Sequence, residues 1–425
     1  MTSEQQTLSE IGESSENYAT PYILRRQGVE KPDSWKIRSL GELFKLEYGK
    51  SLPKKERKEG SYPVFGSNGR SGWHSDYHVD GPGIIVGRKG VNLGIEWSDD
   101  DYNVIDTAYF INGESLNAQD LDLRFLYYNL LDFDLDRLKS GSAVPGLNRN
   151  DFYEETVTLP VLSEQKKIAH ILDSIDRKIE TNNEIVRILE EMSQTLFRRE
   201  FTNFEDYDGD LEYDDSFEEK VPTAWKKKSL EDIANFLNGK AWQKFENEDG
   251  ENELPVIKIK ELRNGISEDS DRVSKSDCPE DYIIEDGQVI FSWSASLVLD
   301  LWTEGPAFLN QHLFKVTSEE HPRWFFYEWV NYHIHRFRNI AEAKKTTMGH
   351  IKRSDLKEAK VLVPPKEELE NKSEKFEPIF ESIVEKRVEN RHLGELRDTL
   401  LPKLMSGEVR VNNINVEDLE VNNEV

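Results

Sequence analysis

The sequence has one cysteine, no long apolar run and far fewer basic than acidic residues. A single thiol, Cys278, excludes an intrachain disulfide and a cysteine-built zinc site. No stretch of eighteen apolar residues occurs, so we expect no transmembrane helix. The first twenty residues have neither the basic start nor the apolar core of a secretory signal. These absences predict a cytoplasmic chain without a membrane partner.

Basic residues are missing from three acidic stretches. Residues 1–20 carry four acids, 203–219 carry nine and 417–425 carry four, with no Lys or Arg in any of them. They supply 17 of the 27 net negative charges, so the net charge of −27 is concentrated there and does not by itself exclude a DNA binder. Such runs are usually solvated linkers or tails. An acidic surface is also expected of a protein that works in high salt, and this hypothesis stays open.

Residues 162–201 contain neither Pro nor Gly and predict one long helix. Ser163 stands where an N-cap is expected. The apolar residues recur at steps of four, three and multiples of seven, which is the spacing of a coiled-coil seam. They are Ile168, Leu172, Ile175, Ile179, Val186, Leu189 and Leu196. A helix of this length spans about 55–60 Å, so we expect it to need a partner helix.

The partner lies in the same chain, 208 positions further on. The repeat matches Ile168 with Phe376, Leu172 with Phe380, Ile175 with Ile383, Ile185 with Leu393 and Leu196 with Leu404. Asn182, which falls inside the first seam, maps onto Asn390. A polar residue in a seam lowers stability but fixes register, so we expect these two residues to set the register of the helix pair. A repeat on this scale determines the architecture of the whole chain.

The segments that precede the two helices repeat as well. Each begins with a tryptophan, Trp35 or Trp225, which we expect to anchor a core. A short strand, a helical turn capped at Ser39 or Ser229, and a Gly-Lys pair follow in both. The pairs are Gly49-Lys50 and Gly239-Lys240.

Both segments continue to a Pro-Val strand entry, Pro63-Val64 or Pro255-Val256, and diverge after it. The first has a turn-rich loop at 65–73, whereas the second has a predicted strand at 256–260 that places Lys258 and Lys260 on one face. Both then show strands, an aromatic helix and a last strand that ends in Pro. We therefore predict an acidic tail (1–30), a first α/β domain (31–161), a long helix (162–201), an acidic linker (202–220), a second α/β domain (221–364), a second long helix (365–406) and an acidic tail (407–425).

The motifs at both helices resemble those of the specificity subunit of type I restriction–modification systems. They are LPVLSEQKKI at 159–168, DRKI at 176–179 and LRDTLLPKLMSGE at 396–408. The resemblance covers about residues 32–410. The start of the second helix departs from the pattern, because PPKEELENK at 364–372 has extra residues and lacks Glu-Gln-Lys-Lys. We expect the geometry of that junction to differ.

The resemblance implies an α/β (α+β) fold with two tandem target-recognition domains and an antiparallel coiled coil. Each domain would read one half of a bipartite double-stranded DNA site, and the helix pair would set the spacer between the halves. The helices would also dock two methyltransferase (M) subunits, and restriction (R) subunits would join that complex.

Motifs for catalysis are lacking. The single Pro-Pro, Pro364-Pro365, is not followed by the aromatic residue of an adenine-methyltransferase motif, and no Gly-x-x-x-x-Gly-Lys-Ser/Thr loop occurs. The histidines show no convincing spacing for a metal site. We therefore expect no enzyme activity, cofactor or metal in this chain itself. S-adenosylmethionine, ATP and Mg would be bound by partner subunits.

A DNA reader needs cations for phosphates and polar groups for base edges. The candidate phosphate contacts are Arg70, Arg88, Lys89, Arg149, Lys240, Lys244, Lys258, Lys260, Lys344, Lys345, Lys352 and Arg353. The candidate base contacts are Ser67, Asn68, Asn148, Gln243, Asn310, Gln311 and His350, and Thr347 completes the predicted DNA-binding set. Ordinary solvated loop side chains are the alternative for each. Trp73, Trp242 and Trp293 are expected to pack in cores, although stacking on DNA is possible.

Two other functions stay open from the sequence. A helical interaction scaffold without a DNA role is favoured slightly by the negative charge. An enzyme, either the recognition part of a fused methyltransferase–nuclease or a glycan-modifying protein, is opposed by the missing catalytic motifs.

Overall fold

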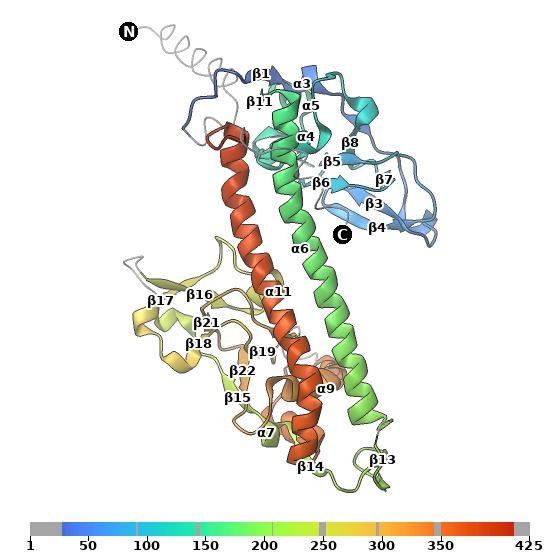
Figure 1. Cartoon of the computed structure of the whole chain (residues 1–425), viewed down its shortest axis with the longest axis vertical. Coiled ribbons are helices and arrows are strands. Elements are labelled where there is room, and N and C mark those ends of the chain that lie inside the picture. Colours follow the sequence, from blue (N-terminus) through green and yellow to red (C-terminus); the bar gives the residue numbers. More distant parts are fainter. Residues whose placement is uncertain are drawn as a thin grey trace. The chain divides into compact units, whose positions relative to one another are not determined.

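The computed structural model describes residues 28–90, 92–141, 145–205, 207–245, 252–294, 297–343 and 350–411 (Figure 1). These residues form two compact units. Unit 1 contains those up to Arg177 and those from Gly394 on, and unit 2 contains those from Lys178 to Leu393. Two long helices, α6 (Leu162–Phe197) and α11 (Lys366–Ser406), each contribute one part to each unit.

Unit 1 is built on an antiparallel four-stranded sheet of order β2-β8-β5-β6. In a second sheet, β3 pairs antiparallel with β4 and parallel with β7. The strands are β1 (Lys36–Ser39), β2 (Glu47–Tyr48), β3 (Tyr62–Gly66), β4 (Gly69–His74), β5 (Gly83–Gly87), β6 (Ile95–Ser98), β7 (Asn103–Val104), β8 (Ala108–Asn112), β9 (Lys139–Ser140), β10 (Gly146–Leu147) and β11 (Thr156–Leu159). The helices are α3 (Leu40–Leu43), α4 (Leu123–Leu131) and α5 (Arg149–Glu154), with short 3-10 turns at Lys54–Glu56, Gly113–Ser115 and Leu135–Leu138.

Unit 2 repeats this plan with the sheet order β15-β22-β19-β20 and a second sheet β17-β16-β21-β18. Its strands are β12 (Leu211–Asp214), β13 (Glu219–Pro222), β14 (Lys226–Ser229), β15 (Asn235–Asn238), β16 (Glu253–Ile257), β17 (Arg272–Ser274), β18 (Ile283–Ile284), β19 (Val289–Ser292), β20 (Leu299–Leu301), β21 (Ala307–Leu309), β22 (Leu313–Thr317) and β23 (Lys360–Val363). Its helices are α7 (Leu230–Ile233), α8 (Ile259–Asn264), α9 (Arg323–Ala343) and α10 (Arg353–Glu358). The hairpin of β12 and β13 lies partly within the stretch predicted as an acidic linker.

The central strands explain why each domain folds around its main sheet. β5 and β19 are buried along their whole length, so they read as continuous apolar runs and not as alternating ones. In unit 1, Leu126 of α4 packs in one core with Val86 of β5. In unit 2, Phe325 of α9 packs with Phe291 of β19. The aromatic helices predicted from both halves are confirmed as the helices that cover these sheets.

The first and last strands of each domain pair with one another. β1 pairs antiparallel with β11, and β14 pairs antiparallel with β23. Because β11 and β23 lead directly into α6 and α11, this pairing fixes where each long helix begins.

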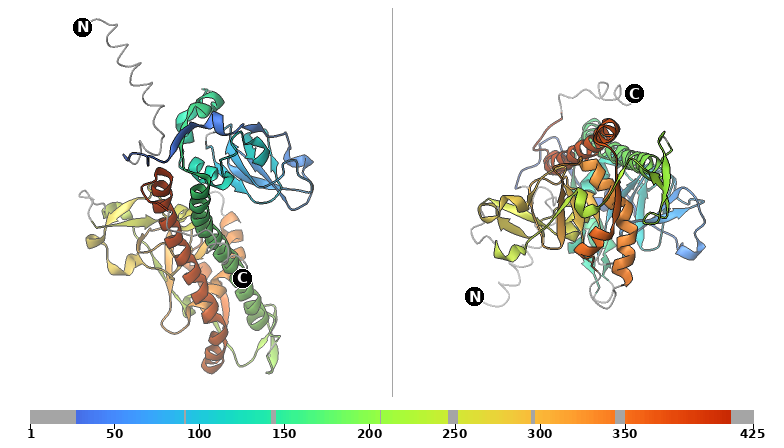
Figure 2. Two further views of the ribbon diagram at one scale, coloured as in Figure 1. Left: turned by 45° about the horizontal axis from the view of Figure 1, so that its top comes forward. Right: turned by 90° about the horizontal axis from the view of Figure 1, so that it is seen from below.

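The long helices pair antiparallel, as expected. In unit 2, Asn182 Nδ2 donates to Asn390 Oδ1 at 2.8 Å, and the nitrogen Nζ of Lys375 lies 2.7 Å from Glu200, just beyond the end of α6. In unit 1, Arg397 contacts Asp176 at 3.2 Å. In unit 2 the rings of Trp324 on α9 and Phe376 on α11 stack with centroids 4.2 Å apart, and α9 lies beside α11 (Figure 2). Ile168, Leu172, Ile175 and Val186 of the predicted seam are buried, and Leu189 and Leu196 are partly buried.

Both predicted tryptophan anchors are confirmed, and each is tied to a long helix. Trp35 Nε1 donates to Glu164 Oε2 at 3.1 Å, and Trp225 Nε1 donates to Glu368 Oε2 at 3.0 Å. Both glutamates are the third residue of their helix. From these glutamates to the paired asparagines there are 18 residues in α6 and 22 in α11. The extra residues predicted at the second helix therefore amount to about one helical turn.

Three local predictions were wrong. Ser163 is not the N-cap of α6, because the helix already begins at Leu162 and Val161 O accepts its first hydrogen bonds. Lys258 and Lys260 do not share a strand face, because β16 ends at Ile257 and α8 begins at Ile259. Residues 65–73 form a β-hairpin with a short turn, not a loop. In the last two cases tertiary pairing overrode a local pattern.

Within the described ranges, no α-helix combines the length and the hydropathy that a membrane span requires.

Candidate nucleic-acid interface

Four chain segments of unit 1 meet at one end of its main sheet. They are residues 48–50, 87–90, 104–107 and 146–149. Arg88 N donates to Thr107 O at 2.9 Å, and Leu147 N donates to Arg88 O at 2.9 Å. Lys50 N donates to Val104 O at 2.8 Å. The backbone itself therefore brings these loops together.

The repeated Gly-Lys pairs have a steric reason. A Cβ at Gly49 would lie 2.2 Å from Ile105 O, and a Cβ at Gly239 would lie 2.2 Å from Asn310 O. Only glycine lets the chain pass this close to the neighbouring backbone. The lysine that follows, Lys50 or Lys240, is exposed.

Two arginines of unit 1 share one exposed tyrosine ring. The guanidinium carbon of Arg88 lies 4.9 Å from the ring centroid of Tyr48 and 5.5 Å from that of Tyr109. Its Nη1 donates to Asp106 O at 2.9 Å. Arg149 lies 5.7 Å from the ring of Tyr48, which is 49% exposed. We call Tyr48, Arg88 and Arg149 the arginine–tyrosine surface.

Burial raises the pKa of Tyr109, and the neighbouring Tyr48 raises it further, whereas Arg88 lowers it. Tyr109 therefore stays neutral at physiological pH.

The hairpin turn at Ser67 and Asn68 is tied to this surface. Ser67 Oγ donates to Thr107 O and accepts from Lys89 N at 3.2 Å. Ser67 O also accepts from Gly94 N at 2.9 Å. The hydroxyl of Ser67 is thus engaged within the protein, whereas Asn68 is exposed.

The other candidates of unit 1 differ in how they are held. Arg70 lies 4.8 Å from the exposed ring of Trp73, and both are on β4. Lys89 is exposed beside Arg88. Asn148 caps α5, because its Oδ1 accepts from Asn150 N at 3.1 Å, so this oxygen is occupied in the structure. Asn148 thus has a structural role that the sequence did not indicate.

Unit 2 has the same backbone arrangement with different side chains. Trp293 N donates to His312 O at 3.4 Å, and Ile351 N donates to Trp293 O at 3.0 Å, as Arg88 does with its neighbours. Trp293 therefore occupies the place of Arg88. Asn238, which precedes Gly239, occupies the place of Tyr48.

The indole of Trp293 is held by polar neighbours. Its Nε1 donates to Asn238 Oδ1 at 2.8 Å and to Gln311 O at 3.2 Å. The ring centroids of His312 and His350 lie 5.8 Å and 6.0 Å from that of Trp293. We call these five residues the tryptophan–histidine surface.

The remaining cations of unit 2 are divided between exposed and engaged ones. Lys258 pairs with Asp271 and lies 4.9 Å from the ring of Trp242. Arg353 Nη2 donates to Phe236 O at 3.2 Å. Lys240, Gln243, Lys260, Gln311 and Lys352 are exposed. Asn310 is buried and its Oδ1 accepts from His312 N at 3.2 Å, so its side chain supports the loop.

Some predicted contacts fall outside the described residues. These are Lys344, Lys345 and Thr347, together with the side chain of Lys244. The predicted set also omitted Tyr48, Asn238 and His312. Trp293, predicted to pack in a core, is partly buried against the core of unit 2. Tyr48 and Asn238 could have been recognised from the sequence, because each directly precedes one of the repeated Gly-Lys pairs.

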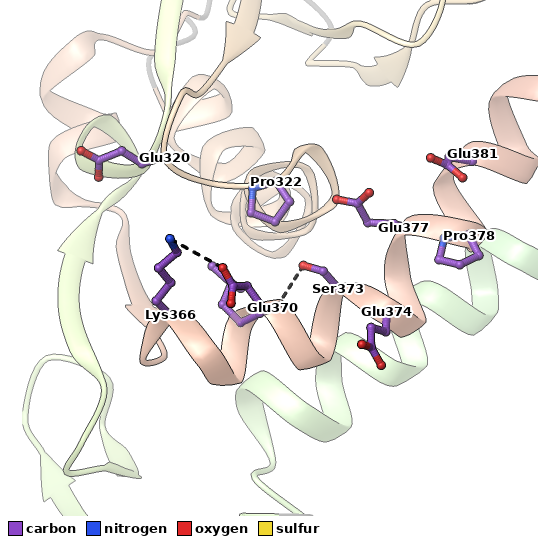
Figure 3. Close-up of a pocket in the computed structure, with 10 residues that line it drawn as sticks. Glu320, Pro322, Lys366, Glu370, Ser373, Glu374, Glu377, Pro378 and Glu381 are labelled. Carbon is purple, nitrogen blue, oxygen red and sulfur yellow. Dashed lines mark hydrogen bonds and ion pairs between the residues drawn. The ribbon is translucent and has the colours of Figure 1, made fainter.

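A cavity of about 540 Å³ lies between α11 and the segment that leads into α9 (Figure 3). It is lined by Glu320, Glu370, Glu374, Glu377 and Glu381, together with Lys366 and other residues. Carboxylates repel phosphate, so this cavity does not belong to a DNA interface. Among the described residues, no group of three or more His, Cys, Asp or Glu side chains is placed to hold a metal ion.

The two domains share one topology, and each is joined to one of the paired helices. Each presents exposed polar and aromatic side chains on the same backbone frame. These features define a two-domain recognition protein. The chain belongs to the family of type I restriction modification DNA specificity domains, whose model matches residues 32–191 and again residues 222–390. The predicted family is therefore confirmed. This membership supports recognition of DNA sequence and does not favour a helical scaffold without a DNA role.

Relatives agree with this assignment. The chain is 27% identical over 310 residues to the MjaIX specificity subunit of Methanocaldococcus jannaschii, covering 68% of this chain and 69% of the relative. It is 23% identical over 426 residues to the MjaVIII specificity subunit of the same organism, covering 91% and 96%. The S subunit of a type I system from M. genitalium shares the fold, with a TM-score of 0.58, 20% identity and coverage of 87% and 96%. These relatives are specificity subunits.

Proposed function

We propose that each unit reads one half of a bipartite double-stranded DNA site. One observation carries the proposal, namely that an equivalent backbone frame presents arginines and a tyrosine in unit 1 but a tryptophan, an asparagine and histidines in unit 2. Different side chains on the same frame are what two readers of different sequences require. Apart from Arg88, the predicted cations around both surfaces would contact phosphates.

We further propose that α6 and α11 set the spacer between the two half-sites and dock two M subunits. α6 has 36 residues, so it is about 54 Å long. R subunits would join through that complex. The chain itself would be non-catalytic, and S-adenosylmethionine, ATP and Mg would be bound by the partner subunits.

Methylome sequencing of host DNA, with and without this gene, tests the proposal. We expect one bipartite methylated motif, with two short specific halves and a fixed gap, to disappear when the gene is removed. If the gene is expressed with its methyltransferase and no motif changes, the proposal is wrong.

Deletion of residues 221–360 tests the division of labour between the units. We expect recognition of one half-site to be lost while that of the other survives. The matched control is the deletion of residues 31–156, which should have the opposite effect. Survival of both half-site specificities in either deletion would contradict the two-reader proposal.

A further inference from the structure

We propose that Arg88 reads a guanine in the half-site of unit 1 and that Tyr48 fixes its guanidinium for this contact. The proposal rests on the DNA-recognition function proposed above, and it gives one base pair of the target. An arginine can donate two parallel hydrogen bonds to O6 and N7 of guanine in the major groove. The sequence alone had suggested Arg88 only as a phosphate contact.

The way Arg88 is held favours a base contact over a phosphate contact. One N–H of its guanidinium is fixed by Asp106 O at 2.9 Å, and the rings of Tyr48 and Tyr109 lie 4.9 Å and 5.5 Å away. A phosphate accepts hydrogen bonds from many directions, whereas a bidentate contact with a base edge requires the guanidinium plane to be oriented beforehand. Arginine has five N–H donors, so the contact with Asp106 leaves enough for a guanine.

The backbone of Arg88 is fixed as firmly as its side chain. Its N–H donates to Thr107 O and its carbonyl accepts from Leu147 N, both at 2.9 Å. The residue therefore projects from a strand end joined to two neighbouring segments. Such rigid support gives a side chain the positional accuracy that base reading needs.

Arg149 provides a contrast within the same surface. Among the described residues its guanidinium contacts only rings, those of Tyr48 at 5.7 Å and Tyr153 at 5.9 Å. No hydrogen bond orients it there. A second cation near the same ring also raises the local positive potential, which attracts the phosphate backbone. We therefore assign Arg149 to a phosphate and Arg88 to a base.

Unit 2 lacks a guanine reader at the equivalent place. Trp293 stands there, and its one donor, Nε1, is already bonded to Asn238 Oδ1 and Gln311 O. At this position the indole can therefore present its ring face to DNA, but its one N–H is not available to a base. The two half-sites should consequently differ at the base pair that lies against Arg88 in one and against Trp293 in the other.

The test uses the full chain in its complete complex, with R88K, R88Q and R149Q variants. Binding is measured to duplexes that carry every single base-pair substitution in the unit 1 half-site, and the methylome of each variant is sequenced. For R88K and R88Q we expect discrimination at one G·C pair to fall roughly 10- to 100-fold, so that this position becomes degenerate in the motif. R88K keeps the charge but not the bidentate geometry.

The R149Q variant is the matched control. We expect its affinity for all duplexes to fall together, its motif to stay unchanged, and the slope of log K against log salt to become shallower by about 0.9. A further variant, Y48N, introduces the residue that unit 2 has at this place. It should weaken the same G·C discrimination as R88K, because the guanidinium loses its ring support.

The half-site of unit 2 is an internal control for folding and assembly. It should be read unchanged by all four variants. The proposal is overturned if R88K resembles the unmodified protein, if R88Q weakens all duplexes equally like R149Q, or if both half-sites are lost in R88K and R88Q. Absence of any bipartite motif for the unmodified complex would instead contradict the proposed function.

Discussion

A glutamate ties the first tryptophan of each domain to the start of a long helix. Glu164 accepts from Trp35 Nε1 and from Arg410 Nε at 3.1 Å and 2.9 Å, and it is 6% exposed. Glu368 accepts from Trp225 in the same way, but its side chain is 31% exposed. The same contact therefore has different energetic weight in the two units, because solvent screens the more exposed carboxylate.

Glu164→Ala should destabilise the protein by about 2–3 kcal/mol, because the indole N–H and the guanidinium both lose a charged acceptor. Glu368→Ala should have a smaller effect. Urea denaturation of the full chain measures both. The control is Glu42→Ala, which breaks the surface pair with Arg38 and should change stability little. Equal losses for all three variants would contradict this ranking.

A second buried carboxyl group makes stability depend on pH. Glu328 of α9 is 2% exposed and accepts hydrogen bonds from Ser193 Oγ and from Asn331 Nδ2. Burial raises the pKa of Glu328 to about 7, and these hydrogen bonds offset only part of the effect. Because the pKa in the folded state exceeds the ordinary value of 4.5, unfolding releases a proton between these two pH values.

The contribution of Glu328 to the free energy of unfolding should therefore be fully present below about pH 4.5 and lost as the pH rises through about 7. Glu328→Gln should match the unmodified protein near pH 4.5 and exceed it at pH 8 by on the order of 3 kcal/mol. Chemical denaturation at both pH values measures this, with Glu191→Gln on the exposed face of α6 as the control. A difference that does not change with pH would contradict the assignment.

At the scale of the elements, the paired asparagines distinguish the helix pair from a purely apolar one. Asn182 is fully buried and donates to Asn390 Oδ1 and to Glu389 Oε2, whereas Asn182 Oδ1 has no hydrogen-bond partner among the described residues. A buried oxygen without a partner lowers stability. The pair therefore contributes specificity of register more than free energy.

Replacing both residues, as Asn182→Leu with Asn390→Leu, should raise the free energy of unfolding by about 1–2 kcal/mol and loosen the register. Denaturation measures the first effect. Hydrogen exchange measures the second, since amides of α6 and α11 should lose uniform protection if several registers coexist. The single variant Asn182→Leu removes the donor to Asn390 Oδ1 and should be less stable than the double variant. Lower stability together with uniform protection in the double variant would contradict the register role.

At the scale of the whole molecule, the length of the helices is proposed to set the spacer of the DNA site. Insertion of one heptad into each helix at matched positions keeps the seam in phase and adds about 10 Å. We expect the spacer in the methylated motif to lengthen by about three base pairs while both half-sites stay the same. Insertion into α6 alone should instead disrupt the pairing and abolish modification. An unchanged spacer would contradict the proposal that helix length sets the distance between the half-sites.

The plan of the molecule can be predicted from its amino-acid sequence. Two domains, two long helices, their seam and the paired asparagines follow from repeats and heptad spacing, which are set by local backbone geometry. Family membership also followed from motifs near the helix ends. These features are periodic or contiguous in the chain, so they can be recognised from the sequence without knowledge of the fold.

Which side chains share a surface depends on how the chain folds in three dimensions. Tyr48, Arg88 and Arg149 are distant in the sequence, and they meet because backbone hydrogen bonds join their segments. The same kind of pairing placed Lys258 at the start of a helix and engaged the hydroxyl of Ser67 inside the fold. Long-range contacts leave no local periodicity, and polar loop residues look alike until the fold determines which of them are occupied.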